Sequence, residues 1–173
     1  MKIVWLVVLM SLSLLVGDYE KGLEAVQKGD YKTALSLLKP LADKGDADAL
    51  YNLGVMYENG LGVKQDYKKA YGLWIKAAQQ NNEKAQYSLG ILYDKGRGVK
   101  QDYKKAFELY TLSANQGHSD AQVNLGVMYY GGQGIKKDKI KAYQWLLKAA
   151  KQGDTTAQNN LDILCKQSPW ACK

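Results

Sequence analysis

Small and apolar residues recur at helical spacing along most of the chain. Between Asp46 and Gly60 they fall at i, i+1, i+4, i+5 and i+8, and a period of 3.6 residues gathers such positions on one helical face: Ala49, Leu50, Leu53, Gly54 and Tyr57. A second stripe of this kind runs from Asp66 to about Gln79. We therefore predict two amphipathic helices in this stretch, each with one buried face.

The residues that flank these stripes are typical of helix ends. Asp46 and Asp66 each precede a stripe and can accept a backbone N–H at a helix start. Gly60 ends the first stripe, where glycine supplies the positive φ that closes many helices. Because Gly60 and Gly62 also permit a tight reversal, the two predicted helices form an antiparallel pair.

The helix pair repeats with a period of 36 residues. Two alanine series show this spacing: Ala34, Ala70, Ala106 and Ala142, and Ala49, Ala85, Ala121 and Ala157. The segments 60–70 and 96–106 are nearly identical. A unit this short cannot bury its own apolar face, so neighbouring units must stack and share one core.

These motifs resemble the Sel1-like repeat family, which is related to the tetratricopeptide repeats. The family's alanine, leucine-glycine, tyrosine and Gly-x-Gly-Val loop stand here as Ala49, Leu53-Gly54, Tyr57 and residues 60–63, and the pattern recurs in the next two units. In the last unit Asp162 replaces the glycine that lets helices approach closely, so we expect this face to meet solvent or a C-terminal cap. The predicted fold class is all-α, a right-handed α-α superhelix (solenoid) of antiparallel helix pairs.

The resemblance covers nearly everything from residue 18 to residue 167. We predict a signal peptide at residues 1–17 and a C-terminal cap at residues 168–173. Between them we expect an opening helix pair, three full repeats and a last partial repeat, at about residues 18–45, 46–81, 82–117, 118–153 and 154–167.

The first residues differ from the repeats. Lys2 is followed by an uncharged, mostly apolar run over residues 3–16, which is shorter than a membrane span. A basic start, a short hydrophobic core and the small Gly17 are typical of a secretory signal peptide, and we expect cleavage after Gly17. A retained N-terminal anchor is the alternative. In either case we expect the repeats outside a bacterial cytoplasm, in the periplasm or secreted.

Cys165 and Cys172 are the two cysteines of the chain. An even count in an exported chain favours a disulfide, which would hold the tail over the last repeat. Their spacing does not resemble a metal or redox motif, so we predict no metal site and no cofactor.

The formal net charge is +7, from 24 lysines and arginines against 17 acidic residues. The lysines cluster in the loops and at the starts of the second helices, so stacked units would align them as a ridge. A nucleic-acid site would favour arginine, whereas Arg97 is the only arginine, and we expect no nucleic-acid partner. We interpret the ridge as a solvated edge; acidic proteins and anionic envelope surfaces are the alternative partners.

Candidate catalytic residues are few. His118 is the one histidine, and we expect it to be a surface or helix-capping residue. Ser36 and Lys39 match the Ser-x-x-Lys motif of penicillin-interacting serine enzymes, but the companion motifs are absent from the sequence. The large aromatic residues at helical spacing are expected in the core: Trp74, Phe107, Tyr110 and Trp145.

The resemblance also indicates a binding surface. In related solenoids the first helix of each unit lines a concave face, whose outward positions here are Asp48, Tyr51, Asn52, Val55, Glu58, Lys84, Tyr87, Ser88, Ile91, Asp94, Asp120, Val123, Asn124, Val127 and Tyr130. This mixture of tyrosine, amide and aliphatic side chains suits an extended peptide or a helix. The alternative is that Val55, Ile91 and Val127 pack between repeats.

We hypothesise that the chain is an exported, non-enzymatic adaptor that binds a protein or peptide through this face. A more specific version is an immunity or regulatory protein that sequesters a secreted or envelope-acting enzyme. The competing hypothesis, based on Ser36 and Lys39, is a cell-wall-related enzyme or a binder of muropeptides or β-lactams (β-lactamase-like).

Overall fold

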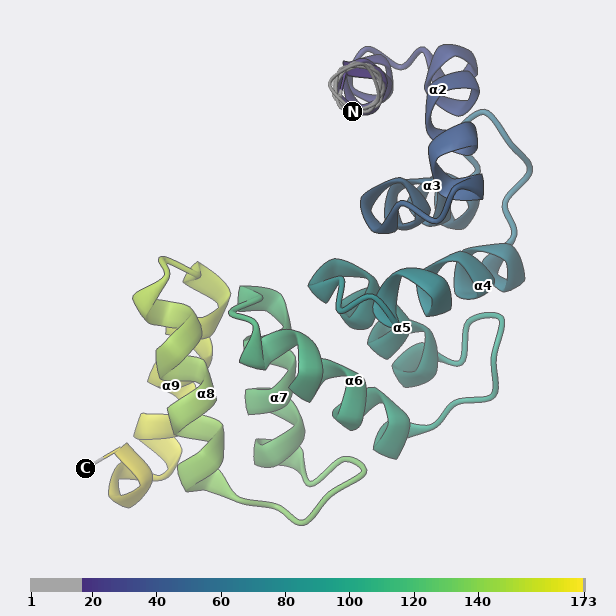
Figure 1. Ribbon diagram of the computed structural model, residues 1–173. Helices are drawn as coiled ribbons and strands as arrows, with labels where there is room; N and C mark the ends of the chain where they lie inside the picture. Colours follow the sequence, from purple (N-terminus) through teal and green to yellow (C-terminus); the bar gives the residue numbers. More distant parts are fainter. Residues whose placement is uncertain (1–16, 173) are drawn as a thin grey trace, which may run out of the picture. The chain divides into compact units, whose positions relative to one another are not determined.

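The computed structural model describes residues 17–172, which form helices joined by short turns and loops (Figure 1). Within this range the predicted all-α class, built from helix pairs at a period of about 36 residues, is confirmed. The described residues divide into two compact units, with the boundary between Gln80 and Asn81.

The first unit contains helical residues 17–27, followed by α2 (Tyr31–Asp43), α3 (Ala47–Asn59) and α4 (Tyr67–Ala78). Helix α3 packs against both α2 and α4. The Gln80 side-chain amide, just after α4, donates a hydrogen bond of 2.9 Å to the Gly45 carbonyl, just before α3. Because the end of α4 meets the start of α3, the two helices are antiparallel, as predicted.

The second unit contains two full helix pairs and a final helix with a short turn. Its elements are α5 (Glu83–Lys95), α6 (Tyr103–Asn115), α7 (Ser119–Gly131), α8 (Lys139–Lys151), α9 (Thr155–Gln167) and the 3-10 helix η1 (Pro169–Cys172). Each helix packs against the next one along the chain. The Ser113 hydroxyl near the end of α6 donates to the Glu83 carbonyl at the start of α5 (2.8 Å), so this pair is antiparallel too.

Each helix from α2 to α9 begins after a side chain that accepts a backbone N–H. The caps of the first helices are Asp46, Asn82, His118 and Asp154, and those of the second helices are Asp30, Asp66, Asp102 and Asp138. The predicted caps Asp46 and Asp66 are thereby confirmed. Gly60, predicted to close its helix, does so with a φ of 69°.

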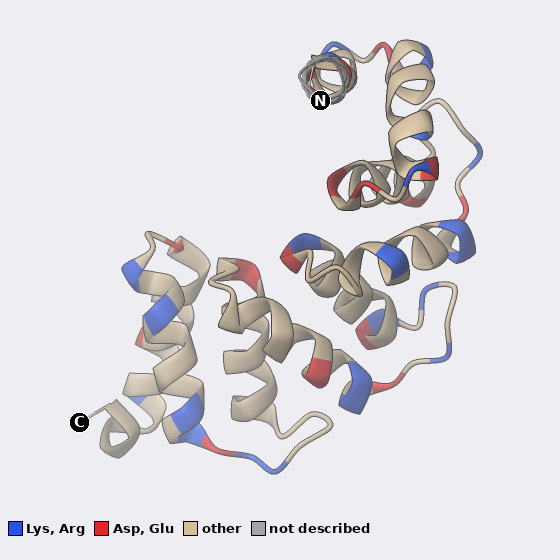
Figure 2. Ribbon diagram, in the orientation of Figure 1, with Lys and Arg blue, Asp and Glu red and all other residues tan. Residues whose placement is uncertain are grey.

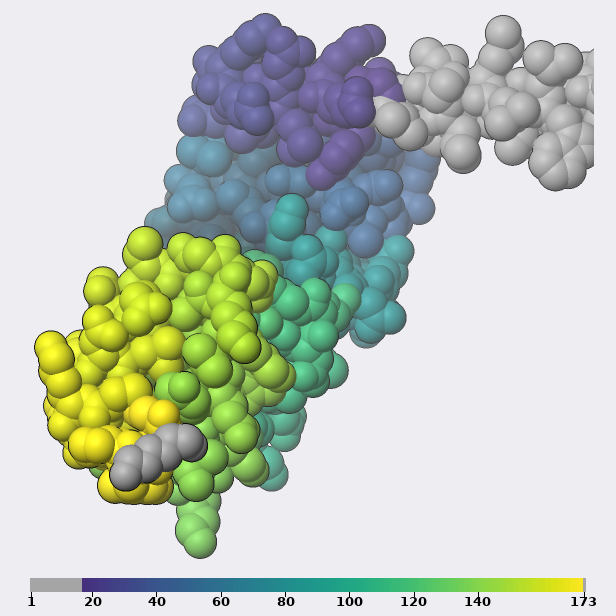
Figure 3. Space-filling view, turned by 90° about the vertical axis from the view of Figure 1, so that its left-hand side faces the viewer, coloured from purple at the N-terminus to yellow at the C-terminus, as the bar shows by residue number. Residues whose placement is uncertain are grey.

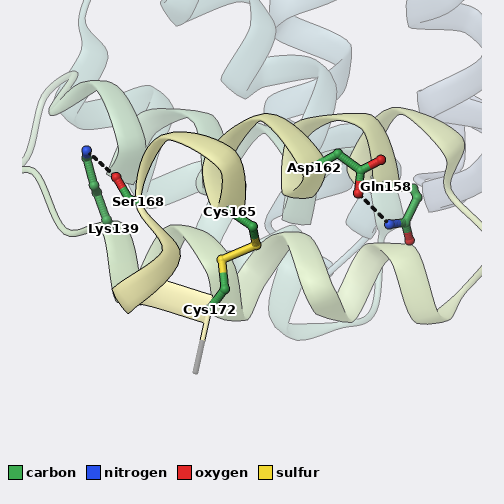
Figure 4. Close-up of a disulfide and its surroundings, with 6 residues drawn as sticks. All are labelled: Lys139, Gln158, Asp162, Cys165, Ser168 and Cys172. Carbon is green, nitrogen blue, oxygen red and sulfur yellow. Dashed lines mark hydrogen bonds between the residues drawn. A yellow bond between two sulfur atoms is a disulfide. The ribbon is translucent and has the colours of Figure 1, made fainter.

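A glycine in the first helix of each pair lies against a larger side chain of the second helix. The pairs are Gly22 with Leu38, Gly54 with Trp74, Gly90 with Tyr110, and Gly126 with Leu146. A Cβ atom on Gly90 would lie 2.6 Å from the Tyr110 ring, so only glycine permits this approach. Asp162, the predicted exception, is exposed on α9 and accepts a hydrogen bond from Gln158 (3.1 Å), as expected for a position that meets solvent (Figure 4).

A disulfide joins Cys165 in α9 to Cys172 in η1 (Figure 4). The turn packs against α8 and α9, and its Ala171 is buried. The Lys139 Nζ of α8 donates to the hydroxyl of the buried Ser168 (2.6 Å), whereas Trp170 is 61% exposed. In the space-filling view the yellow C-terminal turn accordingly lies close to the yellow-green surface of α8 (Figure 3).

The predicted signal peptide lies outside the described residues, apart from Gly17. Among the helices that the structure describes, none is both long enough and apolar enough to span a bilayer.

Candidate protein-binding site

In the first unit, the predicted binding residues lie on α3. Asp48 is exposed, and Tyr51, Asn52, Val55 and Glu58 are partly exposed. The Asn52 side-chain amide donates to the Tyr19 hydroxyl (3.0 Å) and to the Asp48 carbonyl (2.8 Å). The Tyr51 ring stacks on Trp74 with 6.5 Å between centroids. This face therefore combines accessible side chains with internal contacts that fix their positions.

In the second unit, the predicted residues lie on α5 and α7. Those on α5 are Lys84, Tyr87, Ser88, Ile91 and Asp94, and those on α7 are Asp120, Val123, Asn124, Val127 and Tyr130. Ser88 and Val123 are buried, whereas Val127 is 41% exposed. The Tyr87 ring stacks on His118 at 4.6 Å, and the Tyr130 hydroxyl bonds to the Gln167 side chain.

Three of these residues meet around one hollow in the second unit. Asp94, Asn124 and Val127 line a depression of about 260 Å³, together with Tyr103, Tyr110 and Gln133. Tyr110 belongs to α6, so the hollow draws on the first helices α5 and α7 and on the second helix that packs against both of them. The structure thus adds a residue of the predicted core to the candidate face.

The Tyr110 hydroxyl is the unusual group of this hollow. The side chain is 1% exposed, and among the described residues its hydroxyl has no hydrogen-bond partner. Asn124 lies near the hydroxyl, but outside hydrogen-bonding geometry. Burial, and secondarily the Asp94 carboxylate, raises the pKa of Tyr110 far above its ordinary value. The hydroxyl therefore remains a protonated donor.

Lysines gather on the second helices (Figure 2). Helices α4 and α8 contain no acidic residue, and their lysines are Lys68, Lys69, Lys76, Lys139, Lys141, Lys148 and Lys151. One lysine in each of α4, α6 and α8 lies over a tyrosine of the preceding first helix, in the pairs Lys69 with Tyr57 (5.1 Å), Lys105 with Tyr93 (5.1 Å) and Lys141 with Tyr129 (5.4 Å). Part of the predicted ridge therefore contributes to packing within these three pairs.

The residues considered for catalysis lie elsewhere. Ser36 and Lys39 are exposed on α2, and the Ser36 hydroxyl donates to the Thr33 carbonyl of its own helix (2.8 Å). His118 caps α7, as predicted, because its Nδ1 accepts the Ala121 N–H (3.4 Å). In the part of the chain that the structure describes, no cluster of three or more His, Cys, Asp or Glu side chains could hold a metal ion.

Solved structures share this arrangement. A protective antigen of uropathogenic Escherichia coli that displays the SLR fold is 33% identical, with a TM-score of 0.85 over 89% of this chain and 34% of that protein. A Sel1 repeat protein from Oxalobacter formigenes is 30% identical, with a TM-score of 0.83 over 87% of this chain and 60% of the other. This chain therefore spans only about a third and three fifths of these two relatives.

A more distantly similar protein of known structure has the same fold. Cysteine rich protein B of Helicobacter pylori is 24% identical, with a TM-score of 0.61 over 76% of this chain and 95% of that protein. No curated protein matches the chain significantly. The family profile described as "Sel1 repeat" matches four consecutive stretches, residues 14–46, 47–82, 83–118 and 119–154. The chain belongs to the Sel1 repeat family.

Proposed function

We propose that this chain is an exported adaptor that binds a polypeptide partner through the first helices of its repeats. Sel1 repeats mediate protein interactions. The observation that carries the proposal is the face formed by α5 and α7, where exposed Val127 lies beside Asp94 and Asn124 around a hollow. An aliphatic contact next to polar groups is the usual composition of a protein interface.

The charges of this face indicate the kind of partner. Helices α5 and α7 carry the carboxylates Glu83, Asp94 and Asp120 and the lysines Lys84 and Lys95. The surplus of positive charge lies on the second helices and loops instead. The face therefore suits a neutral or basic polypeptide segment better than an acidic one.

Export is supported by the disulfide between Cys165 and Cys172, because such bonds persist mainly in oxidising compartments. An immunity or regulatory role is the more specific form of the proposal. It requires that the partner be a secreted or envelope-acting enzyme whose activity falls when the chain binds.

Two matched substitutions test the face. The partner is first captured by cross-linking in envelope extract and identified, and its binding to the chain is then measured by calorimetry with purified proteins. Val127→Lys places a charge on the α7 face, whereas Ile140→Lys does so on α8, where Ile140 is 50% exposed. We expect Val127→Lys to weaken binding by about tenfold or more, which is about 1.4 kcal/mol, and Ile140→Lys to leave it unchanged. Equal affinity of both variants for the partner would refute this assignment.

A further inference from the structure

Four second-helix side chains occupy one register position, each against a first-helix glycine, but they differ in chemistry. Leu38 and Leu146 have no polar atom to satisfy. The Trp74 indole N–H donates to the Tyr51 carbonyl (3.0 Å), so its polar group is paired within the fold. Among the described members of this series, only Tyr110 carries a polar group without a partner.

This unpaired hydroxyl points to a ligand. Burying a hydroxyl without a hydrogen bond is unfavourable, and packing alone would be served by leucine, as at Leu38 and Leu146. Of the three side chains whose electrostatic effect reaches the hydroxyl, Asp94 and Asn124 line the hollow, whereas the third, Tyr87, does not. Tyr110 lines the hollow with them, beside exposed Val127.

The size and charge of the hollow limit its occupant. Its volume of about 260 Å³ exceeds the ~30 Å³ share of one water molecule but falls short of the ~300–1,000 Å³ of most small-molecule pockets. It therefore suits one side chain of a larger partner. The Asp94 carboxylate is paired with Lys95 Nζ at 2.9 Å, so the lining is close to neutral.

We propose that this hollow binds a side-chain carboxamide, from a glutamine or asparagine of the polypeptide partner. The amide oxygen accepts the Tyr110 proton, and the amide NH2 group donates to Asp94 or Asn124. A carboxylate ligand would lose its hydration without gaining a free cationic partner in this nearly neutral lining, and an ammonium group would offer Tyr110 no acceptor. The inference rests on the proposed function and names the chemistry that this face selects.

Blocked amino acids test the inference without the natural partner. N-acetyl-glutamine N-methylamide is titrated into the ¹⁵N-labelled chain, and the Asn124 side-chain NH2 and Val127 amide signals are followed by NMR. The glutamate analogue tests whether a carboxylate can replace the carboxamide. The alanine analogue has only main-chain amides, so it tests whether these alone account for binding. We expect saturable shifts with the glutamine probe. The glutamate and alanine analogues should bind with an affinity at least about fivefold lower. Equal affinity of the alanine and glutamine probes would overturn the side-chain assignment.

Conservative variants identify the responsible group. Tyr110→Phe removes only the hydroxyl, so we expect the affinity for the glutamine probe to fall about fivefold or more while the thermal midpoint stays the same or rises. Tyr143→Phe on α8 makes the same change away from the hollow and should bind as the unmodified chain does. If Tyr110→Phe binds the glutamine probe with unchanged affinity, the inference is overturned; the proposed function still stands if Val127→Lys weakens binding of the partner. If instead Tyr110→Phe weakens probe binding but Val127→Lys leaves partner binding unchanged, only the proposed function is refuted.

Discussion

At the scale of single residues, His118 stands where other repeats have an aspartate or asparagine. Asp46, Asn82 and Asp154 cap the equivalent helices through a side-chain oxygen, whereas His118 uses Nδ1. Only the neutral imidazole has a lone pair for the Ala121 N–H. Burial lowers the pKa of His118, and this effect exceeds the opposing influence of Asp120 and Glu83.

This cap predicts a pH-dependent stability. The folded pKa of His118 lies below its ordinary value of 6.5, so the unfolded chain takes up the proton more readily. The stabilisation is therefore complete above about pH 6.5 and is lost as the pH falls through the folded pKa. Urea unfolding at about pH 7.5 and about pH 5 measures the loss. His118→Asn, which copies the cap Asn82, should reduce the difference between the two pH values; an undiminished difference would contradict this role.

Tyr110 shows how far the sequence predicts a site. Helical spacing places it correctly in the core, where it is 1% exposed. Whether the Tyr110 hydroxyl makes a hydrogen bond depends on the positions of atoms in α5 and α7 to within an ångström. The helical spacing of residues in the sequence does not contain this information. Trp74 occupies the same register and is satisfied by the Tyr51 carbonyl. A comparison of equivalent positions between repeats would have drawn attention to Tyr110, but only the structure distinguishes the two outcomes.

At the scale of helices, the spacing of each pair is determined by one glycine. A Cβ on Gly90 would lie 2.6 Å from two atoms of the Tyr110 ring, which is packed too tightly to move away freely. Gly72 is also inside a helix, but it is exposed and has open space around its Cβ position. The same substitution at these two positions therefore separates helix propensity from helix packing.

We expect opposite effects of alanine at these glycines. Gly90→Ala should lower the free energy of unfolding by about 1–3 kcal/mol, because an extra carbon in a filled core strains its neighbours. Gly72→Ala should raise it by up to about 1 kcal/mol, because alanine favours a helix over glycine. Urea denaturation followed by circular dichroism measures both changes. A stabilised Gly90→Ala variant would show that α5 and α6 can separate at no cost, contrary to this account.

The opening helix pair, expected at about residues 18–45, differs from the full repeats in its loop. The Gly-x-Gly-Val loop marks the full repeats in the sequence, and their helices lie where the apolar stripes place them. In the first pair only residues 28–30 separate helical residues 17–27 from α2, so this loop motif is missing. The contact between Gly22 and Leu38 nevertheless has the same form as that between Gly54 and Trp74. A short turn thus joins a pair whose packing follows the common rule.

At the scale of the whole chain, net charge describes the proposed binding face poorly. The value of +7 arises mainly from loops and second helices, where several lysines lie over tyrosine rings. Helices α3 and α7 contain acidic residues and no lysine. Average charge would favour an acidic partner, whereas the charge distribution favours a neutral or basic one at the first helices.

The disulfide links compartment to stability. The bridge spans a sequence separation of 7 residues, and loop-closure entropy for a loop this short corresponds to about 2.5 kcal/mol. Because repeat proteins open locally, this stabilisation should be concentrated in α9 and η1. Export would thus change the protein in two measurable ways, in its covalent mass and in the protection of its last helix.

A comparison of two preparations tests this connection. The chain recovered from the periplasm should begin at Asp18, contain no free thiol and show slower amide exchange in α9 than residues 18–173 made in a reducing cytoplasm. The expected difference in protection is about 2–3 kcal/mol, because the closed loop restricts the locally unfolded state. A variant with both Cys165→Ala and Cys172→Ala should exchange identically in the two preparations, since compartment then acts on no bond. Export with cleavage would be refuted if the periplasmic chain contained free thiols or still carried residues 1–17. The stabilising role of the disulfide would be refuted if amide exchange in α9 were equally slow with and without it.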